Sequence, residues 1–245
     1  MPRHLVPRMA FQPVLTEPGS ADRPARVVEW SEFAARAKTA SRVVAEFGIG
    51  DGDWLTRHAL AEPDALYVGF EAVLAYYQKA SARIVAAGSP ALLAFGDARL
   101  GVLPAFIPAG SLDLAVYLFP DPWTKGRHMR RRMLAPQNAA YVARAIKVGG
   151  VLRVRSDVPD YLREALENFP PLGFECVFDE TNLDVERAVT RWERRKLQEG
   201  QTIREVQLRR VRGFEAGEDP GEASPIDVRE VAVHRTGMLR AAGIG

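Results

Sequence analysis

Residues 119–133 read FPDPWTKGRHMRRRM and combine one carboxylate with a dense run of cations. Asp121 lies between Pro120 and Pro122, whose rings fix φ and stiffen the chain on both sides of the acid. The basic side chains that follow it are Lys125, Arg127, His128, Arg130, Arg131 and Arg132. Cations at the start of a helix oppose its macrodipole, and such broken local rules are common at functional sites. The segment therefore predicts an acid beside a phosphate-binding ridge, with a solvated charged face as the alternative.

A second group of residues could hold a nucleoside. The segment EFGIGDG, residues 46–52, places glycines at Gly48, Gly50 and Gly52 directly after an apolar run. Glycine lets the backbone turn sharply and approach a ligand closely. Glu71 ends a second apolar run, where a carboxylate can accept hydrogen bonds from ribose hydroxyls, and Asp97 ends a third, where it can reach an adenine. Taken singly, the glycines also fit an ordinary turn between a strand and a helix.

The spacing of the glycines separates the possible cofactors. A dinucleotide fingerprint reads G-x-G-x-x-G and places a pyrophosphate at a helix N-terminus. Here the spacing is G-x-G-x-G, and Glu46 precedes it. An acid repels phosphate but suits a cation. S-adenosylmethionine carries a sulfonium and an α-amino group and no phosphate, so the pattern favours S-adenosylmethionine over NAD.

Another basic stretch, TRWERRKLQEGQTIREVQLRR, covers residues 190–210. It contains one acid, Glu193, among the bases Arg191, Arg194, Arg195 and Lys196. On its own this stretch fits either a charged connector or part of a binding surface.

The elements that must position these residues can be predicted from apolar runs and breakers. Strands are expected at residues 42–50, 66–71, 91–98, 112–120, 150–157, 174–180 and 202–211. Helices are expected at residues 30–40, with Ser31 as the cap, in the stretch after residue 52, and at 71–88, 130–147 and 158–169. This alternation predicts an α/β fold with a mostly parallel seven-stranded sheet and helices on both faces. Because no long helix separates the last two strands, we expect one of them to run antiparallel at the edge.

The bulk composition bounds the function. The 245 residues carry a net charge of +2, so any affinity for a polyanion must be local. A single cysteine excludes internal disulfides and a cysteine-built zinc site, no metal is expected, and the chain fits a reducing cytoplasm. No apolar run is long enough to suggest a membrane span. We expect a loose arm over residues 1–24 within an N-terminal region 1–40, one domain over 41–211, and a linker and tail over 212–245.

Together these segments resemble the bacterial tRNA (guanine-N7)-methyltransferase family. The family motifs E-x-G-x-G-x-G, G-x-E and D-A are matched by EFGIGDG, VGFE and GDA. Its most specific motif is similar to P-D-P-W-P-K-K-R-H-x-K-R-R and is matched by PDPWTKGRHMRRR. Later motifs are matched by VRSD and TRWE, in the family's order.

The resemblance implies a Rossmann-like class I methyltransferase that methylates N7 of a guanine in tRNA, in the family at guanosine 46 of the variable loop. It implies that S-adenosylmethionine is held or bordered by Glu46, Gly48, Gly50, Glu71, Asp97 and Asp121. Asp121 would be the catalytic carboxylate. The target RNA would be contacted by Lys125, Arg127, His128, Arg130, Arg131, Asp157, Thr190, Arg191, Trp192 and Glu193. The expected partner is tRNA, with no membrane and no metal, and the expected state is a monomer or a homodimer.

Two other functions stay open at this point. The near-neutral charge and the absence of a clear counterpart to the family's basic N-terminal segment favour a methyltransferase of the same fold that acts on a small purine-like heterocycle. The second alternative is a non-catalytic RNA-binding protein of the same fold, against which the cofactor-side acids argue.

Overall fold

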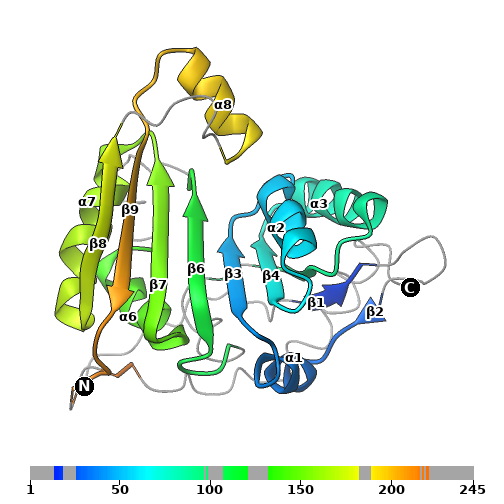
Figure 1. Cartoon of the computed structure of the whole chain (residues 1–245), viewed down its shortest axis with the longest axis horizontal. Helices are drawn as coiled ribbons and strands as arrows, with labels where there is room; N and C mark the ends of the chain where they lie inside the picture. Colours follow the sequence, from blue (N-terminus) through cyan, green and yellow to red (C-terminus); the bar gives the residue numbers. More distant parts are fainter. Residues whose placement is uncertain are drawn as a thin grey trace, which may run out of the picture.

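The computed structural model describes residues 14–18, 26–96, 98, 107–120, 132–181, 189–215, 217 and 219–220. Within these residues, nine strands form one sheet in the order β2-β1-β5-β4-β3-β6-β7-β9-β8 (Figure 1). The strands are β1 (Val14–Glu17), β2 (Arg26–Val27), β3 (Val43–Phe47), β4 (Leu66–Glu71), β5 (Leu92–Phe95), β6 (Leu112–Leu118), β7 (Ile146–Ser156), β8 (Phe174–Thr181) and β9 (Arg204–Arg210).

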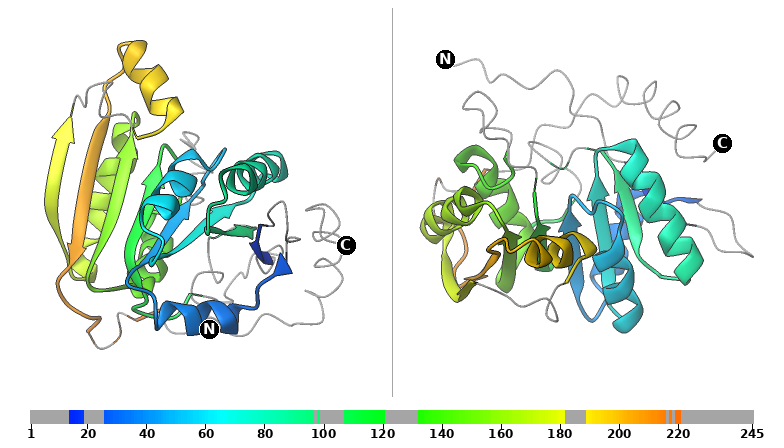
Figure 2. Two further views of the ribbon diagram at one scale, coloured as in Figure 1. Left: turned by 45° about the vertical axis from the view of Figure 1, so that its right-hand side comes forward. Right: turned by 90° about the horizontal axis from the view of Figure 1, so that it is seen from above.

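Helices cover both faces of this sheet (Figures 1 and 2). They are α1 (Trp30–Ala37), α2 (Asp53–Ala61), α3 (Leu74–Ala87), α6 (Pro136–Ala145), α7 (Pro159–Asn168), the 3-10 turn η1 (Pro170–Leu172) and α8 (Arg191–Gln198). Helices α2 and α3 pack on one face, and α1, α6 and α7 pack on the other. This arrangement confirms the α/β fold with helices on both faces that the alternating pattern predicts, and the sheet is parallel over its central strands β5, β4, β3, β6 and β7.

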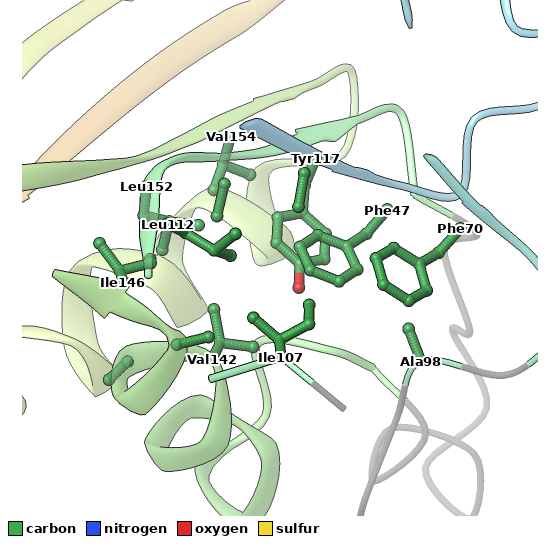
Figure 3. Close-up of a cluster of buried hydrophobic side chains, with 14 of the residues drawn as sticks. Phe47, Phe70, Ala98, Ile107, Leu112, Tyr117, Val142, Ile146, Leu152 and Val154 are labelled. Carbon is green, nitrogen blue, oxygen red and sulfur yellow. The ribbon is translucent and has the colours of Figure 1, made fainter. Parts of the chain in front are cut away.

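The centre of the sheet is parallel and buried on both faces. Strand β3 pairs in parallel with β4 and β6, and all five of its residues are buried. On the α6 and α7 face, near-parallel rings from β4, β3 and β6 stack in a row (Figure 3). The ring centroids of Phe70 and Phe47 are 5.0 Å apart, and those of Phe47 and Tyr117 are 4.9 Å apart. A strand buried on both faces reads as a continuous apolar run, which is why β3 could be predicted from VVAEF.

The strand register brings two acids to the same corner of the sheet. Glu46 of β3 pairs with Gly69 of β4, and Glu71 ends β4 two positions further on. Side chains alternate between faces along a strand, so both carboxylates lie on the α2 and α3 face at the carboxyl end of the sheet. This is the edge where open α/β sheets bind ligands.

The edges of the sheet differ from the sequence-based expectations. The prediction of an antiparallel strand at the edge was wrong in position, because β9 runs antiparallel between β7 and β8 and leaves β8 at the edge. The sheet has nine strands rather than seven, because β1 pairs with β5 and β2 pairs with β1. Residues 14–17 therefore belong to the sheet, which contradicts a loose arm there. Leu15 is buried in the core, and the Thr16 hydroxyl lies 2.6 Å from the Tyr77 hydroxyl of α3.

Two helix predictions also need correction, and one helix was not predicted. The expected helix over 130–147 begins at Pro136 and ends at Ala145, because Ile146 already pairs with Leu112 as the first residue of β7. The expected cap Ser31 lies inside α1, whose N-cap is Glu29. The basic stretch after Thr190 contains a helix, α8, that the apolar pattern did not indicate.

Candidate active site

The glycine turn after β3 depends on left-handed backbone. Gly48, Gly50 and Gly52 have φ values of 73°, 54° and 71°, which side chains other than glycine adopt at a cost. A Cβ added to Gly48 or Gly50 would meet no atom within 4 Å, whereas one added to Gly52 would lie 2.8 Å from Ala80 Cβ of α3. Gly52 is thus needed for packing, while Gly48 and Gly50 border open space in which a ligand can approach the backbone.

Glu71 ties this turn to the end of β4. Its side chain is buried, and Oε2 accepts a hydrogen bond of 3.0 Å from Gly50 N. Oε1 accepts one of 2.8 Å from Val73 N, at the start of α3. The carboxylate therefore stands beside the open side of the glycine turn, held at both oxygens by backbone.

Glu46 lies deeper, at the N-terminus of α2. The first turn of α2, which has no side-chain cap, places the backbone N–H of Leu55 near the Glu46 carboxyl. Only 2% of the residue is exposed, and Oε2 has no hydrogen-bond partner among the described residues. Burial raises the pKa of the Glu46 carboxyl well above its ordinary value. The backbone N–H of Leu55 opposes this rise in the pKa, and the nearby acids Asp53, Asp51 and Glu71 add to it.

Two further acids surround the turn. Asp51 and Asp53 both contact Arg83 of α3, whose Nη2 lies 2.6 Å from Asp51 Oδ2 and whose Nε donates to the Asp51 carbonyl at 2.9 Å. Arg83 therefore braces the turn from its outer side. Arg57 of α2 also pairs with Asp53, at 3.1 Å, so Asp51 and Asp53 are both held by arginines. Glu46, by contrast, keeps a buried oxygen that has no partner among the described residues, and a carboxyl group in this position fits a cationic ligand such as S-adenosylmethionine.

The chain at the end of β6 adopts an unusual conformation. Phe119 has φ of 52°, the one positive value among the described residues other than glycine. Its N–H donates to the Arg155 carbonyl of β7 at 2.8 Å. Bulky residues adopt this conformation only where surrounding contacts enforce it, and such strain clusters at functional sites. Phe119 and Pro120 lead directly into the motif that begins at Asp121.

Several predicted site residues lie outside the described residues. These are Asp97, Asp121, Lys125, Arg127, His128, Arg130 and Arg131. Their roles remain predictions.

The last arginine of the basic run is described and belongs to the core. Arg132 is 1% exposed, pairs with Glu164 of α7 at 2.7 Å and lies over the Tyr161 ring at 5.0 Å. It cannot present its charge to a phosphate from this position. The idea that the whole run 125–132 forms a phosphate-binding ridge is therefore wrong for Arg132, which is packed against α7.

The predicted substrate segment 190–193 begins α8, beyond the carboxyl ends of β6 and β7 (Figures 1 and 2). Thr190 is the N-cap, and its Oγ1 accepts from Glu193 N at 3.0 Å. Arg191 and Trp192 are exposed, with Lys196 Nζ lying 4.9 Å from the Trp192 ring centroid. Glu193 is 0% exposed, so in this structure it anchors α8 and does not offer its carboxylate to a substrate.

Asp157 follows β7 and is half-buried at the same end of the sheet. Arg57 of α2 connects the glycine side of the site with the α8 side, because its guanidinium donates to the Val189 carbonyl. Glu46, Gly48, Gly50, Glu71, Asp157 and residues 190–192 thus share the carboxyl end of the sheet.

Sequence reasoning missed Arg57, Arg83 and Arg155. The alternation of Arg153 and Arg155 in LRVRSD, and of Glu205 and Gln207 in REVQLRR, was a signal that polar side chains occupy one face of the paired strands. No comparable signal marked Arg57 or Arg83.

In the described part of the chain, no helix is long and apolar enough to cross a membrane, and no group of three or more His, Cys, Asp or Glu side chains could hold a metal ion.

Comparison with known proteins gives consistent matches. A family described as "Putative methyltransferase" matches residues 40–206. The chain is 35% identical over 166 residues to the tRNA (guanine-N(7)-)-methyltransferase of Paracoccus denitrificans, covering 67% of this chain and 70% of that protein. It is 35% identical over 174 residues to the protein of the same name from Ruegeria pomeroyi, covering 69% and 72%.

Among solved structures, a mutant of the 16S rRNA (adenine(1408)-N(1))-methyltransferase of Catenulisporales acidiphilia, solved with its cosubstrate SAM, matches with a TM-score of 0.59. The match covers 82% of this chain and 99% of that chain at 16% identity, which establishes a likeness of fold.

Proposed function

The chain belongs to the tRNA (guanine-N(7)-)-methyltransferase family, and from this premise we propose that it transfers a methyl group from S-adenosylmethionine to N7 of a guanine in tRNA. The observation that carries this proposal is that an acidic glycine turn and the exposed residues Arg191 and Trp192 lie at the same end of the sheet. One side suits a cationic donor and the other suits a nucleotide.

The cofactor side is supported by three features. Gly48 and Gly50 leave their backbone accessible, Glu71 stands at the end of β4, and the buried Glu46 Oε2 has no partner among the described residues. We propose that Glu71 binds the ribose hydroxyls, that Asp97 borders the adenine, and that Glu46 supports the positive charge of the ligand.

The reaction asks for positioning more than for proton transfer. Guanine N7 carries an in-plane lone pair and no proton, so no general base is required. Bound S-adenosylmethionine supplies the methyl group on its sulfonium. The protein must align N7 with that methyl group, and a fixed carboxylate can stabilise the positive charge that guanine acquires. We assign this role to Asp121, which can also accept hydrogen bonds from guanine N1–H and the exocyclic amino group.

On the RNA side, cations would hold phosphates and the start of α8 would contact the nucleotide. The phosphate ligands proposed are Lys125, Arg127, His128, Arg130 and Arg131. The nucleotide contacts proposed are Asp157, Thr190, Arg191 and Trp192, since the Trp192 ring is half exposed and can stack on a base. Glu193 is proposed to act indirectly, by fixing this segment.

The test is mass spectrometry of tRNA nucleosides after incubation with the protein and S-adenosylmethionine, with Asp121→Ala and Glu167→Ala as variants. Glu167 is an exposed acid near the end of α7, so its replacement removes the same charge away from the carboxyl end of the sheet. We expect N7-methylguanosine to form, turnover to fall roughly 100-fold in Asp121→Ala, and turnover to stay unchanged in Glu167→Ala. Unchanged turnover in Asp121→Ala would show that Asp121 does not contribute to catalysis.

The same assay separates the alternatives. Methylation of free guanine nucleosides but not of tRNA would identify a small-molecule methyltransferase. Binding of tRNA without calorimetric binding of S-adenosylmethionine would identify a non-catalytic RNA-binding protein.

A further inference from the structure

Four charged side chains form a buried cluster where β7, β9 and α8 meet. Arg155 Nη1 lies 2.6 Å from Glu193 Oε1, and Arg155 Nε donates to Glu205 Oε2 at 2.6 Å. Arg153 adds a two-pronged contact to Glu205, at 2.8 and 2.9 Å. Arg155, Glu193 and Glu205 are 4%, 0% and 1% exposed. We call these four residues, two cations and two anions, the charge cluster.

Within the charge cluster, the pair of Arg155 and Glu193 holds α8 to the sheet. Most surface helices orient themselves by an apolar stripe that faces the core. Glu193 is the buried residue of α8, and Arg191, Trp192, Arg194 and Arg195 are exposed. The ion pair between Glu193 and Arg155 thus orients α8 on the sheet, as apolar packing does for most helices. Replacing buried ion pairs by apolar groups often leaves stability unchanged, so the value of this one lies in the geometry it imposes.

Glu193 also fixes the entry into α8. Its second oxygen accepts a hydrogen bond of 2.6 Å from Val189 N, and its own N–H donates to the Thr190 hydroxyl. The same side chain that binds Arg155 therefore sets the conformation of residues 189–190. Trp192 is the next residue but one after Thr190, so the direction of its ring depends on this anchor.

Arg155 acts at two points at once. Its side chain holds α8 through Glu193, and its carbonyl accepts the N–H of Phe119, the residue with left-handed backbone just before Pro120. Arg155 of β7 thus contacts both the end of β6 and the start of α8, and it fixes their positions relative to each other. Arg57 adds a link from α2 to Val189.

We propose that Arg155 is a positioning residue, which through Glu193 sets the start of α8 over the carboxyl end of the sheet and so aligns the RNA-contacting segment with the end of β6. This inference rests on the proposed function for its consequence in catalysis, while its structural part is independent of the substrate. Arg155 touches neither reactant; its effect passes through α8 and through the backbone of Phe119.

The test compares two double variants that each remove one cation and one anion from the charge cluster. Arg155→Met with Glu193→Gln breaks the link to α8 and leaves the pair of Arg153 and Glu205. The matched control, Arg153→Met with Glu205→Gln, breaks the link between β7 and β9 and leaves the pair of Arg155 and Glu193. Both keep the buried charge balanced, so neither leaves an isolated ion.

The first readout is amide hydrogen exchange in the free protein. We expect exchange over residues 189–198 to accelerate at least about tenfold in the first double variant and to stay near the wild-type rate in the control. The second readout is kinetic: KM for tRNA should rise about tenfold in the first double variant only, with the Kd of S-adenosylmethionine within about twofold of wild type.

Equal exchange in the two double variants, or unchanged exchange in the first, would overturn the proposal. Should the first double variant fail to fold, Arg155→Lys gives the same decision. Lysine keeps the charge but lacks the guanidinium fork that reaches both glutamates, so exchange over 189–198 should still rise. If wild-type protein does not methylate tRNA, the proposed function fails, and the exchange measurement still decides whether Arg155 holds α8.

Discussion

At the scale of single residues, two glycines with left-handed backbone allow the effect of backbone strain to be separated from an effect on ligand binding. Gly50 and Gly88 have φ values of 54° and 63°, and a Cβ at either would meet nothing within 4 Å. Gly50 lies in the turn after β3, whereas Gly88 ends α3. The two positions therefore share a backbone requirement and differ in location.

This pair gives a matched test of the cofactor turn. Alanine at either position should lower the free energy of unfolding by about 1 kcal/mol, because the strain is the same. Only Gly50→Ala should weaken S-adenosylmethionine binding, by roughly tenfold, since its Cβ enters the space beside Glu71. Urea unfolding and calorimetry measure the two effects. An equal loss of affinity in Gly88→Ala would mean that the turn is not the binding surface.

Glu46 predicts a pH dependence of stability. Because burial raises the pKa of this carboxyl above its ordinary value of 4.5, the folded protein binds a proton that the unfolded chain has lost. The free energy of unfolding contributed by this residue therefore falls as pH rises from about 4.5 towards the raised pKa of the folded state. Glutamine has nearly the same shape as glutamate and stays neutral at every pH, so Glu46→Gln lacks this loss.

The measurement is urea unfolding without ligand between about pH 5 and 8, where the stability of Glu46→Gln relative to wild type should increase with pH. Glu167→Gln is the control, because Glu167 is a largely exposed acid on α7. Parallel curves for wild type and Glu46→Gln would contradict the raised pKa.

Residue types alone predicted part of this site. Glu46 and Glu71 could be placed at strand ends because apolar runs precede them. The burial of Glu193 could not be predicted, because its partner Arg155 lies 38 residues away in sequence. A charged residue in a charged segment reads as exposed unless its partner is known.

At the scale of elements, the helix and strand boundaries that were predicted wrongly are those set by hydrogen bonding to a neighbouring strand. Residues 136–147 are rich in good helix formers, yet the helix stops at Ala145 because Ile146 pairs with Leu112. Strand β1 was missed because four residues carry little periodic signal and gain their order from β5. Helix α8 was missed because its buried residue is an acid. Long apolar strands such as β3 and β6 were predicted correctly since their own sequence demands burial.

Arg132 shows how an element is fixed to its neighbour, and it yields a stability prediction. Arg132→Ala should lower the free energy of unfolding by about 3 kcal/mol, because it leaves the partly buried Glu164 without its cation. Arg163→Ala, on the exposed side of the same helix α7, should change it by less than about 0.5 kcal/mol. Urea unfolding of both variants makes the comparison. A similar small effect of both would mean that Arg132 is not an anchor.

At the scale of the whole molecule, a net charge of +2 gives little general attraction to RNA. Any affinity must come from local cations that are not already paired. Among the described residues, Arg195 pairs with Glu199, while Arg191 and Arg194 are exposed on α8 with no ion pair to another described residue.

The proposed interface therefore predicts a specific salt dependence. Replacing Arg191 and Arg194 by alanine should lower the slope of log affinity for tRNA against log salt by roughly 1 per lost phosphate contact. Arg163→Ala removes one positive charge from α7 and should leave the slope unchanged. Filter binding over a series of salt concentrations provides the slopes. Equal slopes for all variants would place the RNA away from α8.

The position of β9 has a consequence for how the chain acquires its fold during synthesis. Strand β8 is translated before β9, but its neighbour in the sheet is β9, which lies between it and β7. In a nascent chain that ends at Thr181, β8 therefore lacks β9, the strand with which it pairs in the folded sheet. The left half of the sheet in Figure 1 can close only after residue 210 has left the ribosome, so completion of this sheet is tied to the end of translation of the domain.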